Sequence, residues 1–158
     1  MILLDFSNLI HKSVHAGGMD VSYDHIRALI FTQIRTIKQK FSKDYGRLVI
    51  CMDAKKYWRK EFFPEYKIRR TLKQKTSRID WTEVYGWINQ VEQDLRKHFP
   101  YQVLHVDRCE ADDIIAVLSQ TTNEKTIICS ADSDMKQLLT RDNIELYSLH
   151  SHTMVRCD

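Results

Sequence analysis

The sequence predicts a single α/β domain with a central, mostly parallel sheet. Three short apolar runs, residues 2–4, 48–52 and 127–129, have the length of buried strands, and each is followed within a few residues by aspartate. A longer amphipathic segment separates the first two runs, as in a strand–helix–strand unit. The chain has 158 residues, of which 43% are hydrophobic. This is enough for one hydrophobic core, but the chain is too short for two ordinary domains.

The first half of the chain is predicted to form one strand–helix–strand unit. Ser22 is a suitable N-cap for the crossover helix, whose isoleucines recur at helical spacing. Because the two strands should be parallel neighbours, Asp5 and Asp53 should lie side by side. The predicted elements are a strand over 1–5, a break at Phe6-Ser7-Asn8, a short helical stretch ending near Gly17 and Gly18, a helix from Ser22 to about Phe41 and, after Gly46, a strand over 48–52.

The second half repeats the alternation of helices and strands. One amphipathic helix should pack on the sheet, and the next begins with the acidic stretch Glu110-Ala111-Asp112-Asp113. The last two short apolar stretches suggest an edge hairpin. The predicted elements are a helix over about 82–98, a strand over 102–106, a helix from Glu110 to Gln120, a strand over 125–130, a short helix over 135–139 and the two hairpin strands over 144–148 and 154–157.

A basic segment with interleaved aromatic residues interrupts the alternation between about residues 54 and 79. Residues 55–78 hold ten Lys or Arg against two Glu, while the whole chain has a net charge of +3. Cationic side chains hold phosphates and aromatic rings stack on unpaired bases, so this mixture suits a groove for single-stranded nucleic acid. The alternative is a mobile basic loop whose aromatic rings, among them Tyr57, Trp58 and Tyr66, pack on the core.

Carboxylates gather where the predicted strands end. Ligands of open α/β sheets bind at that edge, and so many negative charges would repel one another without cations. Oxygen ligands of this kind suit hard cations such as Mg²⁺. The alternative for Glu110, Asp112 and Asp113 is that they cap a helix. An aspartyl-phosphate phosphatase or an adhesion-type metal site is disfavoured, because Ser7 and Leu9 stand where those motifs need other residues.

The remaining composition narrows the class of protein. The longest apolar runs are about five residues, far below the ~20 of a membrane span, so we expect a cytoplasmic protein. The four cysteines lack zinc-site spacing and should be reduced, mostly structural thiols. His150 and His152 stand two residues apart in a polar turn and are interpreted as incidental.

Several motifs together resemble the 5′-nuclease, or flap endonuclease, superfamily. The likeness is strongest to the ribonuclease H of tailed phages, which removes RNA primers, and it covers essentially the whole chain. The combination of Glu-Ala-Asp-Asp with a later Ser-x-Asp-x-Asp is specific, whereas each piece alone is weak. The matching residues are Asp5, Met52-Asp53, Tyr57-Trp58-Arg59, Tyr66-Lys67-Ile68-Arg69-Arg70, Glu110-Ala111-Asp112-Asp113 and Ser130-Ala131-Asp132-Ser133-Asp134.

The resemblance implies a fold, a cofactor and roles for individual residues. The fold would be PIN-like, with a twisted sheet, helices on both faces and a basic helical arch inserted at about residues 54–82. Mg²⁺, with Mn²⁺ as a substitute, would be surrounded by Asp5, Asp53, Asp112 and Asp132, with Glu110 and Asp134 facing a second ion and Asp113 in an outer shell. Lys67 and Arg70 would act on the scissile phosphate, and the arch would bind nucleic acid through Lys55, Lys56, Tyr57, Arg59, Lys60, Tyr66, Lys67, Arg69, Arg70 and Lys73.

The implied activity is cleavage of DNA and RNA–DNA hybrids from 5′ ends or at flaps, as in primer removal during replication. Members of the superfamily carry a second half with a helix-turn-helix-type element that grips duplex DNA, and this element is missing from the 158 residues. Either the 158 residues are a fragment of a longer protein, or the gene is split and a second polypeptide supplies duplex binding. Two alternatives remain open: a PIN-type endoribonuclease acting on single strands, and a non-catalytic strand-binding half of a split nuclease.

Overall fold

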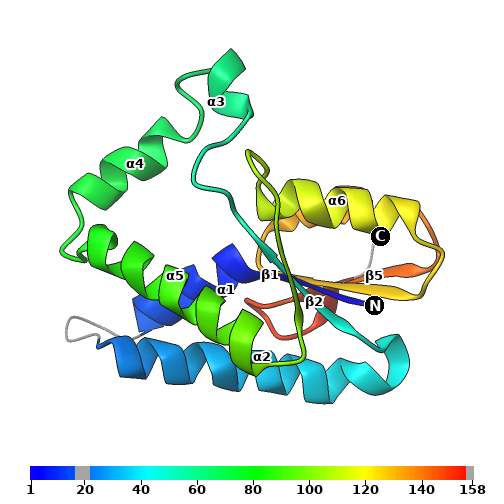
Figure 1. The fold of residues 1–158 in the computed structure, drawn as a ribbon. Helices are drawn as coiled ribbons and strands as arrows, with labels where there is room; N and C mark the ends of the chain where they lie inside the picture. The colour runs from blue at the N-terminus through cyan, green and yellow to red at the C-terminus, as the bar shows by residue number, and fades with distance from the viewer. Residues whose placement is uncertain (17–21, 156–158) are drawn as a thin grey trace.

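The computed structural model describes residues 1–16 and 22–155, which form a six-stranded sheet between two layers of helices (Figure 1). The α/β class is confirmed. The elements in chain order are β1 (Ile2–Asp5), α1 (Phe6–Ala16), α2 (Tyr23–Tyr45), β2 (Leu48–Met52), α3 (Arg59–Phe62), α4 (Ile68–Lys75), α5 (Trp81–His98), β3 (Gln102–His105), α6 (Ala111–Thr121), β4 (Thr126–Ser130), the 3₁₀ helix η1 (Ser133–Leu138), β5 (Ile144–Ser148) and β6 (Met154–Val155).

The sheet order is β3-β2-β1-β4-β5-β6, and only the β5–β6 pairing is antiparallel. The predicted pairing of the first two strands and the edge hairpin are therefore confirmed. Since β1, β2 and β4 are parallel neighbours, their carboxyl ends meet at one edge of the sheet. The residues that follow these three strands are consequently brought together.

Alternate residues of the central strands pack into two cores, one on each face of the sheet. Ile2 and Leu4 face α1, α2 and α5, whereas Leu3 and Val49 face α6 and η1. All four side chains are almost completely buried. Burial of an aliphatic side chain contributes roughly 1.5–3 kcal/mol, so these strands anchor the edge that carries the aspartates.

Helix boundaries differ from the predictions in two places. Phe6-Ser7-Asn8 does not break the chain, because the Asp5 carboxylate accepts the Asn8 backbone N–H and caps α1, which starts at once. Helix α2 is capped by Ser22 as predicted but runs to Tyr45 instead of about Phe41. It ends at Gly46, whose φ of 78° suits the left-handed region that glycine adopts without strain.

The other boundaries move by a few residues. The helix predicted over 135–139 is a 3₁₀ helix that begins at Ser133, because the Asp132 carboxylate caps it. Helix α5 begins at Trp81 after its N-cap Asp80, and the strand predicted over 102–106 ends at His105. The predicted ends near Gly17 and Cys157 fall outside the described residues.

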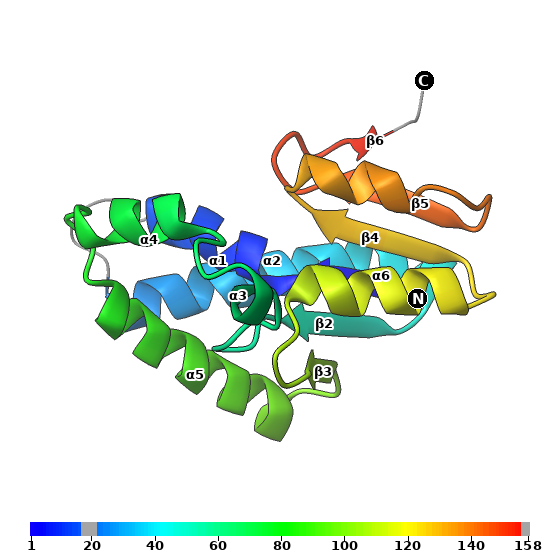
Figure 2. The same ribbon diagram turned by 90° about the horizontal axis from the view of Figure 1, so that it is seen from above.

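The basic segment forms an arch, defined here as residues 54–80, that stands away from the sheet (Figures 1 and 2). Its helices α3 and α4 contain no buried residue. Several large apolar side chains of the arch are exposed, with Phe62 at 80% and Leu72 at 55%. The alternative that its aromatic rings pack on the core is wrong for Trp58, Phe62 and Phe63, whose side chains are exposed.

Two smaller predictions can also be compared with the structure. Cys51 and Cys129 are buried, and the three cysteines within the described residues are free thiols. None of the helices in the described ranges combines the length and apolar character that a membrane span requires.

Candidate active site

Asp5, at the carboxyl end of β1, is a deeply buried carboxylate with 1% of its surface exposed. Its two oxygens accept hydrogen bonds from the Asn8 backbone (3.1 Å), the Asn8 side chain and the Ser130 hydroxyl (2.7 Å). Burial raises the pKa of Asp5 even though these hydrogen bonds favour the charged form. The carboxylate is therefore held in one orientation by α1 and β4.

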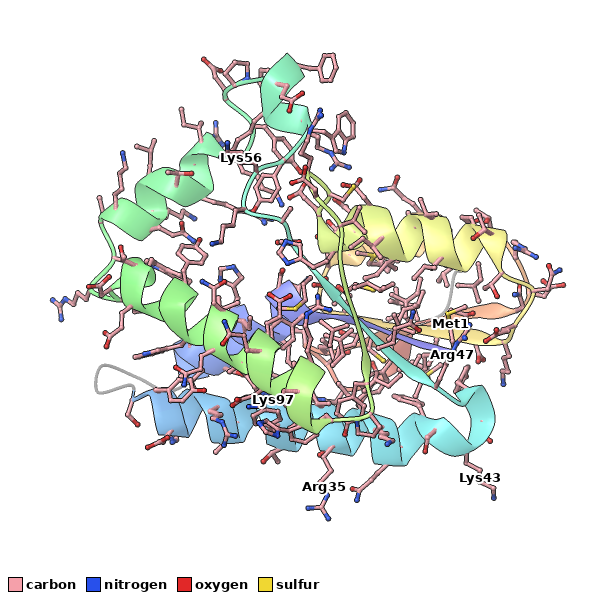
Figure 3. The ribbon with its side chains drawn as sticks, in the orientation of Figure 1. Met1, Arg35, Lys43, Arg47, Lys56 and Lys97 are labelled. Carbon is pink, nitrogen blue, oxygen red and sulfur yellow. The ribbon has the colours of Figure 1, made fainter. Side chains whose placement is uncertain are left out.

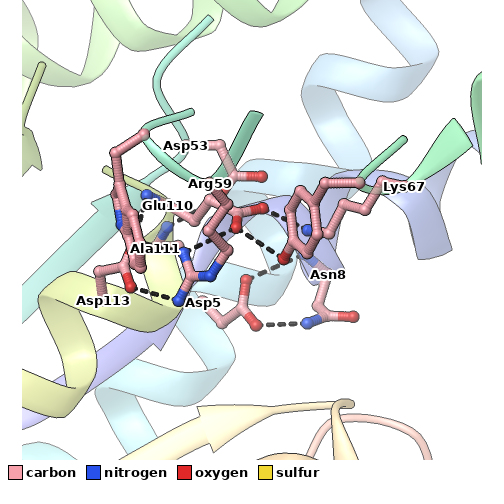
Figure 4. Close-up of polar contacts among 10 residues, drawn as sticks. Asp5, Asn8, Asp53, Arg59, Lys67, Glu110, Ala111 and Asp113 are labelled. Carbon is pink, nitrogen blue, oxygen red and sulfur yellow. Dashed lines mark hydrogen bonds and ion pairs between the residues drawn. The ribbon is translucent and has the colours of Figure 1, made fainter. Parts of the chain in front are cut away.

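Asp53 and Asp132 lie on either side of Asp5, after the neighbouring strands β2 and β4. The Asp53 carboxylate accepts the backbone N–H of Ala111 at 2.7 Å, which joins the end of β2 to the first turn of α6 (Figure 4). The Asp132 backbone donates to Ser130 Oγ at 3.0 Å. Both carboxylates are thus positioned by the ends of the elements that carry them.

Asp112, in the first turn of α6, faces these three carboxylates. Burial and the negative charges of Asp5, Asp53 and Asp132 raise the pKa of Asp112 to about 7. A shift of this kind is the expected effect of like charges gathered in a partly desolvated site. The structure therefore brings together the four residues that the resemblance assigned to one ion.

Glu110, the N-cap of α6, is 1% exposed and is neutralised by the arch. It accepts hydrogen bonds from Arg59 Nη1 (3.0 Å), the Tyr66 hydroxyl (2.8 Å) and the Lys67 ammonium. Burial lowers the pKa of Lys67, but the bond to Glu110 outweighs it and leaves that pKa raised. Glu110 is thus the place where the arch is fastened to the acidic edge.

Asp113 is held by the same part of the arch. Arg59 donates to both of its oxygens, at 2.6 and 2.8 Å, and Trp58 Nε1 donates at 3.2 Å (Figure 4). Burial raises the pKa of Asp113, but the hydrogen bonds and charge of Arg59, the Glu110 backbone N–H and the Trp58 hydrogen bond together outweigh burial and hold that pKa below its usual value. Two carboxylates occupy the Arg59 guanidinium in this conformation, so nucleic-acid binding by Arg59 stays a prediction that requires these ion pairs to open.

Lys67 has a backbone conformation that lysine rarely adopts. Its φ of 58° lies in the left-handed region, and it stands directly before the first residue of α4. Such a residue costs of order 1–3 kcal/mol and persists when its surroundings over-determine it. The ion pair with Glu110 is an interaction that holds Lys67 in this conformation.

The other predicted arch residues divide by exposure. Tyr57 is half-buried, and burial, Asp53 and Glu110 raise the pKa of its hydroxyl. Beside it, an open cavity of about 400 Å³ is lined by Phe63, Glu65, Lys67, Ile68, Arg69 and Arg70. The predicted cations that point into solvent are Lys55, Lys56, Lys60, Arg69, Arg70 and Lys73.

Two features of the predicted metal site are not present in the structure. Asp134 is exposed, and within the described part of the chain its carboxylate makes no hydrogen bond with the other predicted residues. In residues 1–16 and 22–155, no three His, Cys, Asp or Glu side chains lie close enough together to hold a metal ion. Glu110 and Asp113 are instead paired with the arch cations Arg59 and Lys67.

Sequence reasoning missed three residues that organise this site. Asn8 and Ser130 together hold Asp5, and Trp58 holds Asp113. The sequence did contain a signal for Asn8. An aspartate at the end of a strand can cap a helix by accepting the backbone N–H three residues later, and Asn8 is at that position. Ser130 is the first residue of the Ser-x-Asp-x-Asp motif, but the motif does not indicate its contact with Asp5, because that contact depends on β4 lying beside β1.

The chain was then compared with known proteins. The family model of the 5′-3′ exonuclease N-terminal resolvase-like domain matches residues 1–158. Ribonuclease H of Enterobacteria phage T4 is 31% identical over 155 residues, an alignment that covers 92% of this chain and 51% of that protein. The chain thus spans about half the length of this relative.

Solved structures show the same fold. A structure of the phage T5 5′-exonuclease with bound divalent zinc ions has a TM-score of 0.77 at 19% identity, and the match covers 99% of this chain and 57% of that one. The phage T5 D15 flap endonuclease in a complex with DNA and metal ions has a TM-score of 0.75 at 18% identity, with coverage of 98% and 57%. With the family model matching its whole length, the chain belongs to the 5′-3′ exonuclease N-terminal resolvase-like domain family, the PIN-like half of the 5′-nucleases.

Proposed function

We propose that this chain carries the active site of a Mg²⁺-dependent nuclease that cuts phosphodiester bonds at 5′ ends or flaps of DNA and RNA–DNA hybrids. The observation that supports it best is the convergence of Asp5, Asp53 and Asp132 on Asp112, whose pKa they raise together with burial. The names of the relatives agree: a ribonuclease H, a 5′-exonuclease and a flap endonuclease with DNA and metal ions.

The donor set fits a hard divalent cation by its chemistry. Mg²⁺ prefers carboxylate oxygens and keeps several waters, so it does not require the carboxylates to form a closed cage. Asp5, Asp53, Asp112 and Asp132 would hold it, and Mn²⁺ would substitute. A bound cation would neutralise these carboxylates and polarise the phosphodiester and the attacking water.

The chain's own residues would prepare the substrate for this chemistry. Asn8 and Ser130 fix the orientation of Asp5, so one carboxylate is placed before substrate binds. A phosphate arriving under the arch would compete with Glu110 for Lys67, while Arg70 is exposed and available for a second contact. The cations would bind phosphate, and exposed aromatic rings such as Phe63 would stack on unpaired bases.

The experiment compares cleavage by the wild-type chain with that by three variants. Labelled 5′-flap DNA, an RNA–DNA hybrid and unstructured RNA are incubated with Mg²⁺, Mn²⁺ or EDTA. We expect cation-dependent cutting near 5′ ends that Asp112→Asn and Asp132→Asn each reduce by orders of magnitude. Asp107→Asn, in the exposed loop before α6, is the matched control and should leave the rate unchanged.

The other outcomes discriminate among the candidate functions. Unchanged rates in Asp112→Asn or Asp132→Asn would remove the catalytic assignment of these carboxylates. Internal cutting of unstructured RNA with no preference for 5′ ends would favour a PIN-type endoribonuclease. Binding of a single strand without cleavage in either cation would support a non-catalytic strand-binding half, and cleavage regained with an added duplex-binding polypeptide would identify a split nuclease.

A further inference from the structure

A second group of basic side chains lies beside the acidic edge, on the side opposite the arch. The turn after β5, residues 149–153, is fixed to the end of β4 by a hydrogen bond from the Leu149 N–H to the Ser130 carbonyl at 2.9 Å. Figure 2 shows this turn next to the carboxyl end of β4. Ser130 also holds Asp5, so the turn adjoins the candidate active site.

Four basic or titratable side chains meet at this turn. Lys12 of α1 donates to the Leu149 carbonyl at 2.7 Å and lies 2.8 Å from His152 Nε2. Lys40 of α2 donates to the Tyr147 hydroxyl at 3.1 Å and lies over its ring. Burial lowers the pKa of His152, and the nearby groups Lys12, Lys40 and His150 lower it further, so all three lie close to the His152 ring.

The group has no carboxylate to neutralise it within residues 1–16 and 22–155. The partners of Lys12 and Lys40 are a carbonyl, an imidazole and a phenol, and neither lysine belongs to an ion pair of the described chain. In the arch, by contrast, the partly buried cations Arg59 and Lys67 are paired with carboxylates. Positive charge gathered at an accessible turn without a partner favours an anion.

The turn itself is built to hold its shape. The backbone N–H groups of His150 and Ser151 donate to the Ser148 hydroxyl, and the His152 N–H donates to the Ser148 carbonyl. The backbone of His152 has a φ of 58°, in the left-handed region that few non-glycine residues adopt. The histidine pair is therefore placed in a defined position beside the lysines.

We propose that Lys12, Lys40, His150 and His152 form an anion site that binds a backbone phosphate of the nucleic acid substrate beside the point of cleavage. The proposal rests on the proposed function, because it names a further contact for the same substrate. Asp5 directly precedes α1 and Lys12 lies in that helix seven residues later, so their backbones are separated by roughly 10 Å along the helix axis at 1.5 Å per residue. A strand engaged at the active site would carry a phosphate within that reach.

The test measures the salt dependence of oligonucleotide binding in EDTA, where cleavage is prevented. In Lys12→Gln/Lys40→Gln, loss of one neutralised phosphate should reduce the slope of log affinity against log salt by about 0.7 for a single strand. Affinity at low salt should fall several-fold. The matched control is Lys43→Gln/Lys97→Gln, which removes the same charge from exposed lysines away from this edge (Figure 3).

A second measurement localises the contact and does not depend on the double variant folding. The ring signals of His150 and His152 in the wild-type chain should shift when the oligonucleotide is titrated in, while those of His98 and His105 should not. Lys40→Gln alone, at an exposed position of α2, should show a smaller loss of affinity than the double variant.

This site alone would be overturned if the wild-type chain binds and cuts its substrate but two expected changes are absent. The slope of log affinity against log salt would then be unchanged in the double variant, and the ring signals of His150 and His152 would not shift. A wild-type chain that neither binds nor cuts any substrate overturns the proposed function and this site with it. The two failures are therefore distinguishable.

Discussion

Arg59 and Asp113 form a two-pronged ion pair that joins the foot of the arch to the first turn of α6, with nitrogen–oxygen distances of 2.6 and 2.8 Å. The guanidinium also lies 4.6 Å from the centre of the Trp58 ring. Both charged side chains are less than a third exposed, so solvent screens the pair only in part. The pair therefore sets where the arch begins relative to the acidic edge.

The first prediction is that Arg59→Lys destabilises the protein. Lysine cannot reproduce the fork geometry, and hydrogen bonds to charged groups contribute ~1.5–3 kcal/mol. We expect the free energy of unfolding in urea to fall by about 1–3 kcal/mol. The matched control is Arg108→Lys, whose pair with Glu61 is about half exposed on both sides and should cost less than ~1 kcal/mol. Equal losses in the two variants would mean that the Arg59 pair is no more than a surface contact.

The second prediction concerns the left-handed backbone of Lys67. Lys67→Ala and Lys67→Gly both remove the ion pair with Glu110, but only glycine also relieves the strain at a φ of 58°. Lys67→Gly should therefore be more stable than Lys67→Ala by about 1 kcal/mol in chemical denaturation. If the alanine variant is equally or more stable, the left-handed conformation is not retained in solution.

The strands and their aspartates could be predicted from the sequence, because a buried parallel strand is a short apolar run that can be recognised without knowing its neighbours in the fold. Asp5, Asp53, Asp112 and Asp132 follow from that pattern and from the helix start at residue 111. The partners of Arg59 could not be predicted in the same way. Composition identifies a basic arch, but which of its cations turns inward depends on the fold of the arch over α6.

Asn8 shows a second limit of sequence reasoning. An asparagine after a strand is typical of a turn. Here its backbone N–H instead donates to the Asp5 carboxylate, which caps the start of α1. The Asn8 side chain donates to Asp5, which is a local contact, and also to Ser130, a contact that exists only because β1 and β4 are neighbours. The residue was therefore predicted as part of a break although it supports the site.

The third prediction follows from this contact. Asn8→Ala removes a donor from a carboxylate that is 1% exposed, and leaving a buried polar group less satisfied costs roughly 1–3 kcal/mol. We therefore expect the free energy of unfolding at pH 7 to fall by roughly 1–3 kcal/mol. Calorimetry should also show weaker binding of divalent cations. Asn123→Ala, which removes an exposed hydrogen bond to Arg141, is the control and should change little. A fully stable Asn8→Ala would show that water replaces the amide at Asp5.

The fourth prediction is a pH dependence of stability in EDTA. The pKa of Asp112 is raised in the folded state to about 7 by burial and by Asp5, Asp53 and Asp132, so folding favours its protonated form. Its destabilising effect is absent below the unfolded pKa of about 4, grows as pH rises and is complete above about 7. Asp112→Asn should therefore melt at the same temperature as the wild type near pH 4 and at a higher temperature at pH 8. Asp107→Asn is the matched control.

Divalent cations should reverse this order. Neutralising the carboxylates stabilises the folded wild type by RT ln(1 + [L]/Kd), or about 2.7 kcal/mol at a hundredfold excess over Kd. Asp112→Asn lacks one donor and should gain much less, so the two melting temperatures should draw together or cross as Mg²⁺ or Mn²⁺ is added at pH 8. A wild type that melts at the same temperature with and without these ions would contradict the assignment, and the four carboxylates would then be helix caps and strand-end polar groups only.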